Sequence, residues 1–477
     1  MPTVAKMFSG ARLRRLREEH GLTQVALART LDLSTSYVNQ LENDQRPITV
    51  PVLLTLTERF DLPSHYFSSD SDARLVADLS DVFTDTDGAV SPGQIEELVA
   101  RMPEVGRNLV ALHRRLRDAT EELEAFRSHA TTEASLPPER PMPFEEVRDF
   151  FYDRNNYIGD LDTAAEQMFS ESKMSVGGLD VQLSALMHDR FGVRVVVDGG
   201  LAAHAKRSYD PDTKVLRIAQ WLLPGQRAFQ IATQLALISQ PELLSAILAT
   251  DDQLSSESRG VARIGLANYF AGAFLLPYRE FRSAAAELRY DIDLLARRFE
   301  VGFETVCHRL STLQRPQLRG VPFIFVRTDK AGNISKRQSA TAFHFSRVGG
   351  SCPLWVVHDA FAQPGRIVTQ VAQMPDGRSY FWLAKTTAPE GQGYLGQHKS
   401  FAIGLGCDLV HAAKLVYSTG IALDDPATAV PIGAGCKICN RSLCAQRAFP
   451  YLGERVAVDE NTGSGLPYSP ATGLSAN

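Results

Sequence analysis

Residues 22–42 read LTQVALARTLDLSTSYVNQLE, and this stretch predicts two short helices joined by a tight turn. Thr23 and Ser34 each precede an amphipathic run, and both are residue types that are preferred at helix N-caps. We expect one further helix before this pair and one after it. Together these segments predict an all-α helix-turn-helix domain over residues 8–67.

The second helix of the pair is expected to expose a polar face. In helix-turn-helix proteins this helix lies in the DNA major groove. There Asn and Gln can bond to adenine edges and Thr methyl groups can contact thymine, while flanking polar and basic residues contact phosphates. The candidates for binding double-stranded DNA are Gln24, Ser34, Thr35, Ser36, Tyr37, Asn39, Gln40 and Arg46. The alternative is a helical bundle that binds a protein instead.

Charge in the 477-residue chain is arranged in blocks. The chain has 50 Lys and Arg against 55 Asp and Glu, which excludes a uniformly basic nucleic-acid coat, so DNA binding requires a local basic face. Residues 1–60 have eight basic and six acidic side chains, whereas residues 61–100 have one Arg and nine acids. The sequence starts without an apolar signal and has no bilayer-length apolar run, so we expect a cytoplasmic protein with no membrane partner.

Residues 68–143 are expected to form an acidic connector and a dimerisation helix. Apolar residues recur there at alternating spacings of three and four, as in the a/d seam of a coiled coil. The seam comprises Met102, Val105, Leu109, Leu112, Leu116, Ala119, Leu123 and Phe126. It predicts a homodimer that reads a pseudo-palindromic site. The alternative is a helix that packs on its own domain.

The rest of the chain predicts an α+β middle domain and a β-rich end. Residues 144–318 predict mainly helices with a short strand pair at 193–197 and 215–218. Residues 319–455 predict strands, and 456–477 a flexible tail. The expected strands are VPFIFVR (321–327), ATAFHFSR (340–347), LWVVHD (354–359), IVTQVAQM (367–374) and SYFWLAKT (379–386). The fold class is therefore multidomain and mainly α, with a β-rich C-terminal domain.

Six cysteines are too few for a disulfide scaffold in a chain of this length, and clustered thiols favour metal binding. Cys436 and Cys439 form a C-x2-C pair, and Cys444 follows after four residues. Cys407 could supply a fourth thiolate. Four thiolates suit a structural Zn²⁺ or an iron–sulfur cluster, and the spacing alone does not choose between them. Unliganded cysteines are the alternative, and the isolated Cys307 is expected in the core.

Two segments resemble known families. The helix-turn-helix resembles the Xre-type, phage-repressor-like family. The later helix Phe229–Leu237 resembles the zinc-binding helix of ImmA/IrrE-type metallopeptidases, which carries H-E-x-x-H. Here Thr233 and Leu237 stand at the histidine positions, Gln234 at the glutamate position, and Leu266 at the third ligand position. These side chains cannot hold zinc or act as a base, so peptidase activity is disfavoured and the cleft is expected to be a binding pocket.

Over residues 8–453 the chain resembles the short-chain fatty-acyl transcriptional regulators of actinobacteria, which control propionate and acetate metabolism. The most specific stretches are RLSTLQRPQLRGVPF, SKRQSATAFHFS, QMPDGRSYFWLAKT and IGAGCKICNRSLCAQRAFP. The resemblance implies a non-enzymatic regulator that binds promoter DNA, responds to an acyl-CoA effector and carries a [4Fe–4S] cluster.

The same resemblance implies which residues form the two ligand sites. The cluster ligands would be Cys436, Cys439 and Cys444, with Cys407 as the fourth. An acyl-CoA needs cations for its phosphates and an aromatic face for its adenine. The candidate effector residues are Tyr157, Arg207, Asn268 and Tyr269. Two alternatives stay open, namely a redox sensor in which the cluster is the main signal and a regulator stabilised by zinc.

Overall fold

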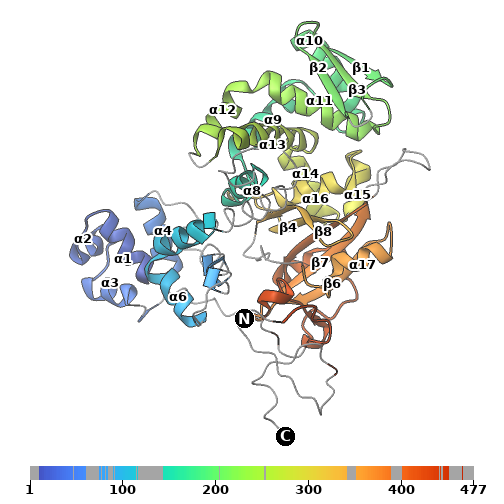
Figure 1. Cartoon of the computed structure of the whole chain (residues 1–477). Helices are drawn as coiled ribbons and strands as arrows, with labels where there is room; N and C mark the ends of the chain where they lie inside the picture. The colour runs from blue at the N-terminus through green and yellow to red at the C-terminus, as the bar shows by residue number, and fades with distance from the viewer. Residues whose placement is uncertain are drawn as a thin grey trace, which may run out of the picture. The chain divides into compact units, whose positions relative to one another are not determined.

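The computed structural model of the chain divides into two compact units, Met1–Ala125 and Phe126–Asn477, and each is described by itself (Figure 1). The described residues are 10–60, 75–83, 90–116, 143–340, 351–387, 400–450 and 465, with gaps at 44, 47, 77, 81, 91, 114, 203–204, 252–253, 440 and 442–443. The expected strand over 340–347 and the expected tail over 456–477 lie almost entirely outside these residues. The same is true of the last three seam residues, Ala119, Leu123 and Phe126.

A four-helix bundle opens the first unit, as the sequence predicts. Its helices are α1 (Gly10–Glu19), α2 (Gln24–Thr30), α3 (Thr35–Glu42) and α4 (Val50–Arg59). The Thr23 hydroxyl accepts the N–H of Ala26 at 3.1 Å, and the Ser34 hydroxyl accepts the N–H of Tyr37 at 3.1 Å, so both predicted N-caps are confirmed. On α2, Ala28 is buried in the bundle core and Ala26 is half-exposed.

The rest of the first unit packs around a second small core that includes α6 (Pro92–Arg101). The chain is helical again over 103–113. Val110 is buried in this core, and Leu109 packs against it. The seam residues Met102, Val105, Leu112 and Leu116 are exposed large apolar side chains. The predicted seam therefore leaves an unburied apolar stripe within the described part of this unit.

The second unit begins with nine described helices, and the long α13 (Ser256–Leu275) lies at their centre. They are α8 (Pro143–Asp153), α9 (Gly159–Glu171), α10 (Leu179–Phe191), α11 (Pro224–Ser239), α12 (Pro241–Ala249), α13 (Ser256–Leu275), α14 (Tyr278–Glu287), α15 (Ile292–Arg298) and α16 (Phe303–Ser311). Most of α13 is buried, and it contacts α8, α9 and α11. Among the described helices, no single one is apolar and long enough to cross a membrane, and α11 with α12 reaches that length only as a pair bent by 79°.

A small three-stranded sheet lies beside α10 and α11. Its strands are β1 (Arg194–Asp198), β2 (Arg207–Asp210) and β3 (Val215–Ala219), in the order β1-β3-β2. The predicted pair, β1 and β3, is confirmed and is parallel, while the unpredicted β2 pairs antiparallel with β3.

A six-stranded sheet follows. Its strands are β4 (Phe323–Thr328), β5 (Ile334–Ser339), β6 (Val368–Gln373), β7 (Ser379–Thr387), β8 (Phe401–Asp408) and β9 (Ala429–Pro431), in the order β5-β4-β8-β7-β6-β9. Short 3-10 helices cover Leu409–Lys414, Val416–Ser418, Pro426–Thr428 and Cys436–Ile438. The sheet confirms the β-rich end of a multidomain, mainly α chain.

One predicted strand, LWVVHD, is wrong. Residues Val356–Ala362 form the helix α17 instead. Val356, Val357 and Ala360 are buried at helical spacing and pack on the sheet. Packing of this one face outweighs the strand preference of the β-branched pair, because β-propensity depends strongly on tertiary context.

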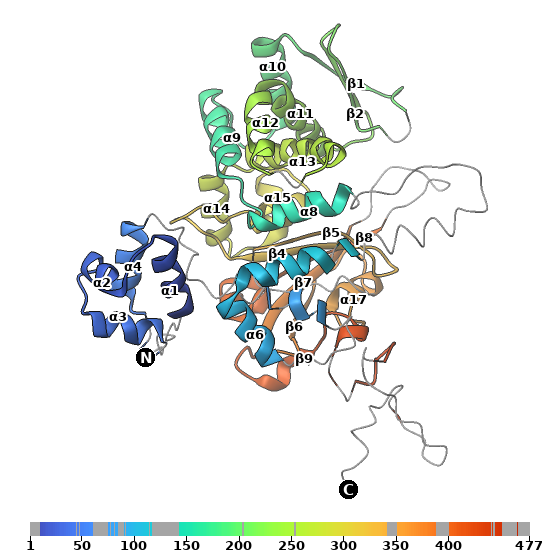
Figure 2. The same cartoon turned by 60° about the vertical axis from the view of Figure 1, so that its left-hand side comes forward.

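The sheet is buried on both faces, and the pleat divides its side chains between two cores. On β4, Phe323 and Phe325 join the core that also holds the helices of this unit, whereas Ile324 and Val326 face α17. Hence the core does not break at the expected boundary near residue 318. Figure 2 shows the helices and the sheet stacked in one unit.

A buried ion pair links three helices of this core. Asp162 of α9 accepts two hydrogen bonds from Arg309 of α16, at 2.7 and 3.0 Å. The side chain of Arg309 is 2% exposed and that of Asp162 is fully buried. Tyr269 of α13 donates to the same carboxylate at 2.8 Å, and Arg315 approaches it at 3.3 Å. The carboxylate is thereby satisfied in an interior where an unpaired charge would be very costly.

Replacing Arg309 with Met is expected to lower the free energy of unfolding by about 3–5 kcal/mol, because Asp162 would stay buried without its main partner. All three tryptophans of the chain lie in the second unit, so urea unfolding followed by tryptophan fluorescence reports on that unit alone.

The matched control is Arg298→Met. Arg298 pairs with Glu287 at 3.0 Å on the surface, and its loss is expected to cost less than about 1 kcal/mol. Equal losses for the two variants would contradict the structural role of the buried pair.

Candidate functional site

The polar face of α3 is the candidate DNA-reading surface. Thr35, Ser36 and Asn39 are exposed, and Tyr37 and Gln40 are half-exposed. Val38 and Leu41 anchor the opposite face of the helix in the bundle core. The guanidinium of Arg46 lies 5.6 Å from the Tyr37 ring centroid, and the Arg46 N–H donates to the Gln40 carbonyl at 3.3 Å. The helix therefore presents short polar side chains beside one exposed cation.

Glu42 fixes the angle between the bundle helices. Its buried carboxylate accepts from Arg17 of α1 at 2.6 Å and from Gln24 of α2 at 2.7 Å. The hydrogen bond that Arg17 donates to Glu42 is the main cause that raises the pKa of the Arg17 guanidinium. The Asn39 side-chain oxygen accepts from Asn43 at 2.9 Å, which holds its amide in place. Sequence reasoning did not identify the Arg17–Glu42 pair, although the two residues join separate helices of one motif.

Three of the predicted DNA contacts are already engaged within the bundle. The Gln24 amide donates to Glu42, the Ser34 hydroxyl is the N-cap of α3, and the Asn39 side-chain oxygen accepts from Asn43. Their side chains position the recognition helix. The remaining candidates lie together on one side of α3 and the turn that follows it.

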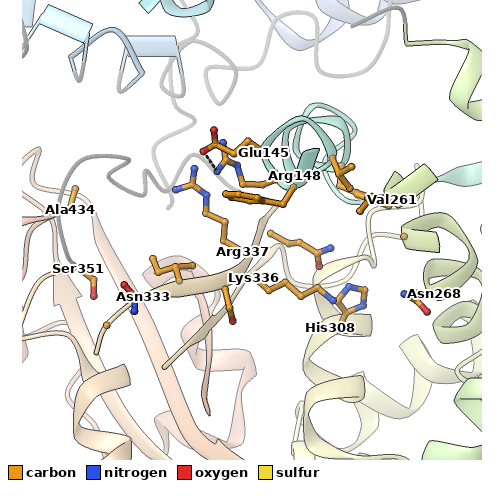
Figure 3. A pocket seen from close by; sticks show the side chains of 18 of the residues that line it. Glu145, Arg148, Val261, Asn268, His308, Asn333, Lys336, Arg337, Ser351 and Ala434 are labelled. Atoms are coloured by element: carbon orange, nitrogen blue, oxygen red, sulfur yellow. Dashed lines mark hydrogen bonds and ion pairs between the residues drawn. The ribbon is translucent and has the colours of Figure 1, made fainter. Parts of the chain in front are cut away.

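A cavity of about 800 Å³ lies within the second unit (Figure 3). Its walls come from α8, α13, the hairpin between β4 and β5, and the loop at 432–434. Val261 and Ile264 present exposed apolar side chains to it. Pockets of 300–1,000 Å³ with apolar walls and a few polar groups are typical of small-molecule sites.

Among the described residues, three cations line this cavity. Arg148 of α8 bonds to Glu145 at 3.2 Å and to Asp149 at 3.1 Å. Arg337 of β5 reaches toward Arg148 and Glu145, and Lys336 points along the opposite wall (Figure 3). The cavity thus combines apolar surface with a cationic side, which are the two features that a thioester of a phosphorylated carrier requires.

The structure places two of the four predicted effector residues at this cavity. Asn268 and Tyr269 line it, whereas Tyr157 and Arg207 are not among its lining residues. The Tyr157 hydroxyl accepts from Arg315 at 3.3 Å, so its ring belongs to the network around the buried ion pair. Arg207 donates to Gln230 at 2.9 Å, and burial lowers the pKa of its guanidinium.

The walls supplied by α8 and β5 were missed because their sequences give no sign that they meet. The two elements lie far apart in the chain, and they touch only in the folded unit.

The peptidase-like helix is α11. The buried Thr233 hydroxyl donates to the Phe229 carbonyl at 2.7 Å and contacts the Asn268 side-chain oxygen at 3.2 Å. Leu266, expected at the third ligand position, is fully buried in the apolar core. Asn268 is therefore the α13 residue that faces Thr233, and it connects this helix pair to the cavity.

The cysteines near the C-terminal end line a small depression. Cys436, Cys439 and Cys444 contribute to it, and the fourth thiol there is Cys352. Cys407 is fully buried on β8, in the core shared with the helices, and burial raises its pKa. The pleat of β8 turns its thiol to the helix side of the sheet, so Cys407 does not line this depression, in which Cys352 lies with the other three thiols. Cys307 is in the core, as predicted.

Backbone and cationic groups surround these thiols. The N–H groups of Gly433 and Leu354 donate to the Cys352 sulfur, and the N–H of Ala448 donates to that of Cys436 at 3.5 Å. A Cβ on Gly433 would lie 2.7 Å from the Cys439 sulfur, so this close approach requires glycine.

N–H groups that donate to sulfur are typical of cysteine-ligated metal and iron–sulfur sites, so the donor set fits such a group. In the described residues, however, no three His, Cys, Asp or Glu side chains converge on a common metal position.

Family models match three parts of the chain. A helix-turn-helix model matches residues 13–67, an IrrE N-terminal-like domain model matches 188–311, and the model of the short-chain fatty acyl coenzyme A regulator C-terminal domain matches 312–468.

Similar proteins extend over nearly the whole chain. It is 80% identical over 469 residues to the HTH-type transcriptional regulator PrpR of Mycobacterium tuberculosis, covering 98% of this chain and 96% of that protein. It is 48% identical to the HTH-type transcriptional regulator RamB of the same organism, covering 98% and 99%. It is 41% identical to the propionyl-CoA carboxylase regulator of Cereibacter sphaeroides, covering 97% and 98%.

A solved structure of a Mycobacterium tuberculosis transcriptional regulator is also similar. It matches with a TM-score of 0.68 and 81% identity, and the match covers 69% of this chain and all of that one. From the three matched models and these near full-length identities, we conclude that the chain belongs to the short-chain fatty acyl coenzyme A regulator family.

Proposed function

We propose that this chain is a cytoplasmic transcription factor that binds promoter DNA through α3 and responds to a short-chain acyl-CoA held in the large cavity. The observation that carries the proposal is the combination, in one chain, of a helix-turn-helix and a separate cavity with apolar and cationic walls. Three similar proteins are named as regulators, and the name of one of them is propionyl-CoA carboxylase regulator.

The α3 surface supports sequence-specific binding to double-stranded DNA. Asn39 and Gln40 are amides of the type that read adenine in the major groove. Arg46 supplies a phosphate contact at the edge of the same surface. Because Glu42 ties α3 to α1 and α2, the reading side chains are presented on a rigid support.

The cavity supports the effector part of the proposal. Arg148 and Arg337 offer charge-assisted bonds to phosphates, and Val261 and Ile264 offer an apolar surface for the acyl chain. Thr233 cannot serve as a zinc ligand, and Gln234 cannot act as a general base. Both substitutions support a binding role and not a peptidase role for this region.

We also propose a [4Fe–4S] cluster, with Zn²⁺ as the alternative, at Cys436, Cys439, Cys444 and Cys352. A cluster would supply redox sensitivity when bound. Arg447 donates to the backbone carbonyls of Cys436 and Cys439 at 3.0 and 2.7 Å. These bonds would fix the backbone of the C-x2-C pair and so hold its two thiols in position.

A redox sensor is the second candidate function, and one residue shared by two sites favours it. Gly433 lines both the large cavity and the thiol depression. A change at the cluster could therefore alter the cavity wall without any intervening element. In a redox sensor the state of the cluster, and not the binding of acyl-CoA, would set the affinity for DNA.

The exposed apolar stripe that includes Leu112 and Leu116 supports a homodimer, which sizing chromatography can check. A second copy of the chain is the partner that would bury the stripe and pair two helix-turn-helix modules.

Asn39→Ala and Gln40→Ala are each expected to weaken binding to a selected DNA site by about 1–3 kcal/mol and to change binding to random duplex little. The site is obtained by selecting bound fragments from random duplexes, and affinities are measured at one fixed salt concentration because ionic contacts are salt-dependent. Gln167→Ala, which removes an exposed amide on α9, is the control. Equal losses on both DNAs would remove the base-reading role.

Arg148→Gln is expected to weaken binding of propionyl-CoA by about 10- to 100-fold, because one charge-assisted phosphate contact is lost. Calorimetry measures the affinity, and Arg190→Gln, on the exposed end of α10, serves as the control. If propionyl-CoA neither binds the wild-type chain nor changes its affinity for the selected DNA, the effector proposal is wrong.

After anaerobic purification the wild-type chain is expected to be brown and to contain iron. Cys352→Ala should lose most of the iron, whereas Cys407→Ala should retain it, because Cys407 lies in the core. A colourless protein that contains zinc would select the zinc alternative. A protein with neither metal, or iron loss in Cys407→Ala alone, would contradict the assignment.

A further inference from the structure

Lys336 is the one lysine among the described residues that line the large cavity. It lies on β5, the edge strand of the sheet, opposite Arg327 of β4. Its amine lies 5.6 Å from the centroid of the Phe325 ring. Figure 3 shows its side chain running along the cavity wall toward His308 of α16. A long amine-bearing side chain therefore stands inside the space proposed for a thioester.

Burial disfavours the ammonium form of Lys336, and the groups around its amine offset this only in part. The carboxylate of Glu304 raises the pKa of Lys336, but it forms its ion pair with Arg327, at 3.1 Å. In the described part of the chain no carboxylate forms an ion pair with Lys336 itself. His308 is neutral because burial lowers its pKa well below the usual range, and Arg327 is a second cation near the Lys336 amine.

Burial lowers the pKa of Lys336 to about 8. At pH 7, therefore, about a tenth of the molecules carry a neutral amine, far more than for a lysine with the reference pKa of about 10.4. Desolvation of this kind is one way in which proteins activate lysine as a nucleophile.

We propose that Lys336 is an acyl acceptor, whose amine takes the acyl group from an acyl-CoA bound in the cavity and releases the CoA thiol. This inference rests on the proposed function of the cavity as an acyl-CoA site. It adds a covalent modification that outlasts the bound effector, because the amide would remain after the CoA has left.

The step needs no co-reactant. The ammonium form first gives one proton to solvent, and the neutral amine attacks the thioester carbonyl carbon. The new C–N bond forms as the C–S bond breaks, and the thiolate takes the second proton of the nitrogen. Binding in the cavity would raise the effective concentration of the thioester around the amine. The product replaces a cation with a neutral acyl amide in the cavity wall.

The full chain is incubated with propionyl-CoA, and peptide mass spectrometry follows propionylation of each lysine with time. Lys330, exposed in the turn between β4 and β5, is the matched internal reference. Lys336 is expected to react at least about ten times faster than Lys330, because the proposed site holds a propionyl-CoA molecule beside Lys336 and none beside Lys330. In Lys336→Arg the rapid modification should vanish, while that of Lys330 should continue.

A pH profile and a competitor test the mechanism. The rate at Lys336 should level off above about pH 8, whereas that of free Nα-acetyllysine in the same tube should rise toward its pKa of about 10.4. Excess S-propyl-CoA, a thioether that cannot transfer its chain, should slow the reaction at Lys336 and leave that at Lys330 unchanged.

The thioether also separates the two proposals. If it raises the melting temperature of the chain but Lys336 reacts no faster than Lys330, the acyl-acceptor inference is wrong and the effector proposal stands. If neither thioether nor thioester binds, the proposed function itself fails. Fast modification of Lys336 that the thioether does not slow would also overturn the inference, because the acyl group would not come from the cavity.

Discussion

The pair formed by Asp162 and Arg309 constrains the helical core of the second unit. Two opposite charges taken out of water must stay together, because either one alone would be far more costly than the pair. Here they bind α9 to α16, and Tyr269 adds α13 through the same carboxylate. These helices cannot shift independently of one another without leaving a buried charge unsatisfied.

The position of the cavity follows from this constraint. The hydroxyl of Tyr269 holds α13 against Asp162, while its neighbour Asn268 faces the cavity. On α16, Arg309 points into the ion pair and the adjacent His308 lines the cavity. The network that secures the helices thus also sets two walls of the space that we propose for the effector.

The six-stranded sheet brings the cavity and the thiols together. Its pleat sends Phe323 and Phe325 into the helical core and Ile324 and Val326 toward α17, so the sheet is a shared wall. Gly433 follows the last strand and contributes to both the cavity and the thiol depression. Metabolite binding and the chemistry of the thiols would therefore act on one short loop.

The sequence by itself determined the features that depend on neighbouring residues. Thr23 and Ser34 predict their helices because an N-cap acts within three residues, and alternating apolar residues predict β6 and β7 in the same local way. The loss of zinc ligands at Thr233 and Leu237 is likewise visible in the sequence. Tertiary structure alone decided that Cys352 and not Cys407 lies with the other thiols, that 356–362 is a helix, and that α8 meets β5 at the cavity. Those outcomes depend on which distant segments pack together and on which face of a strand meets the core, and spacing along the chain does not record either one.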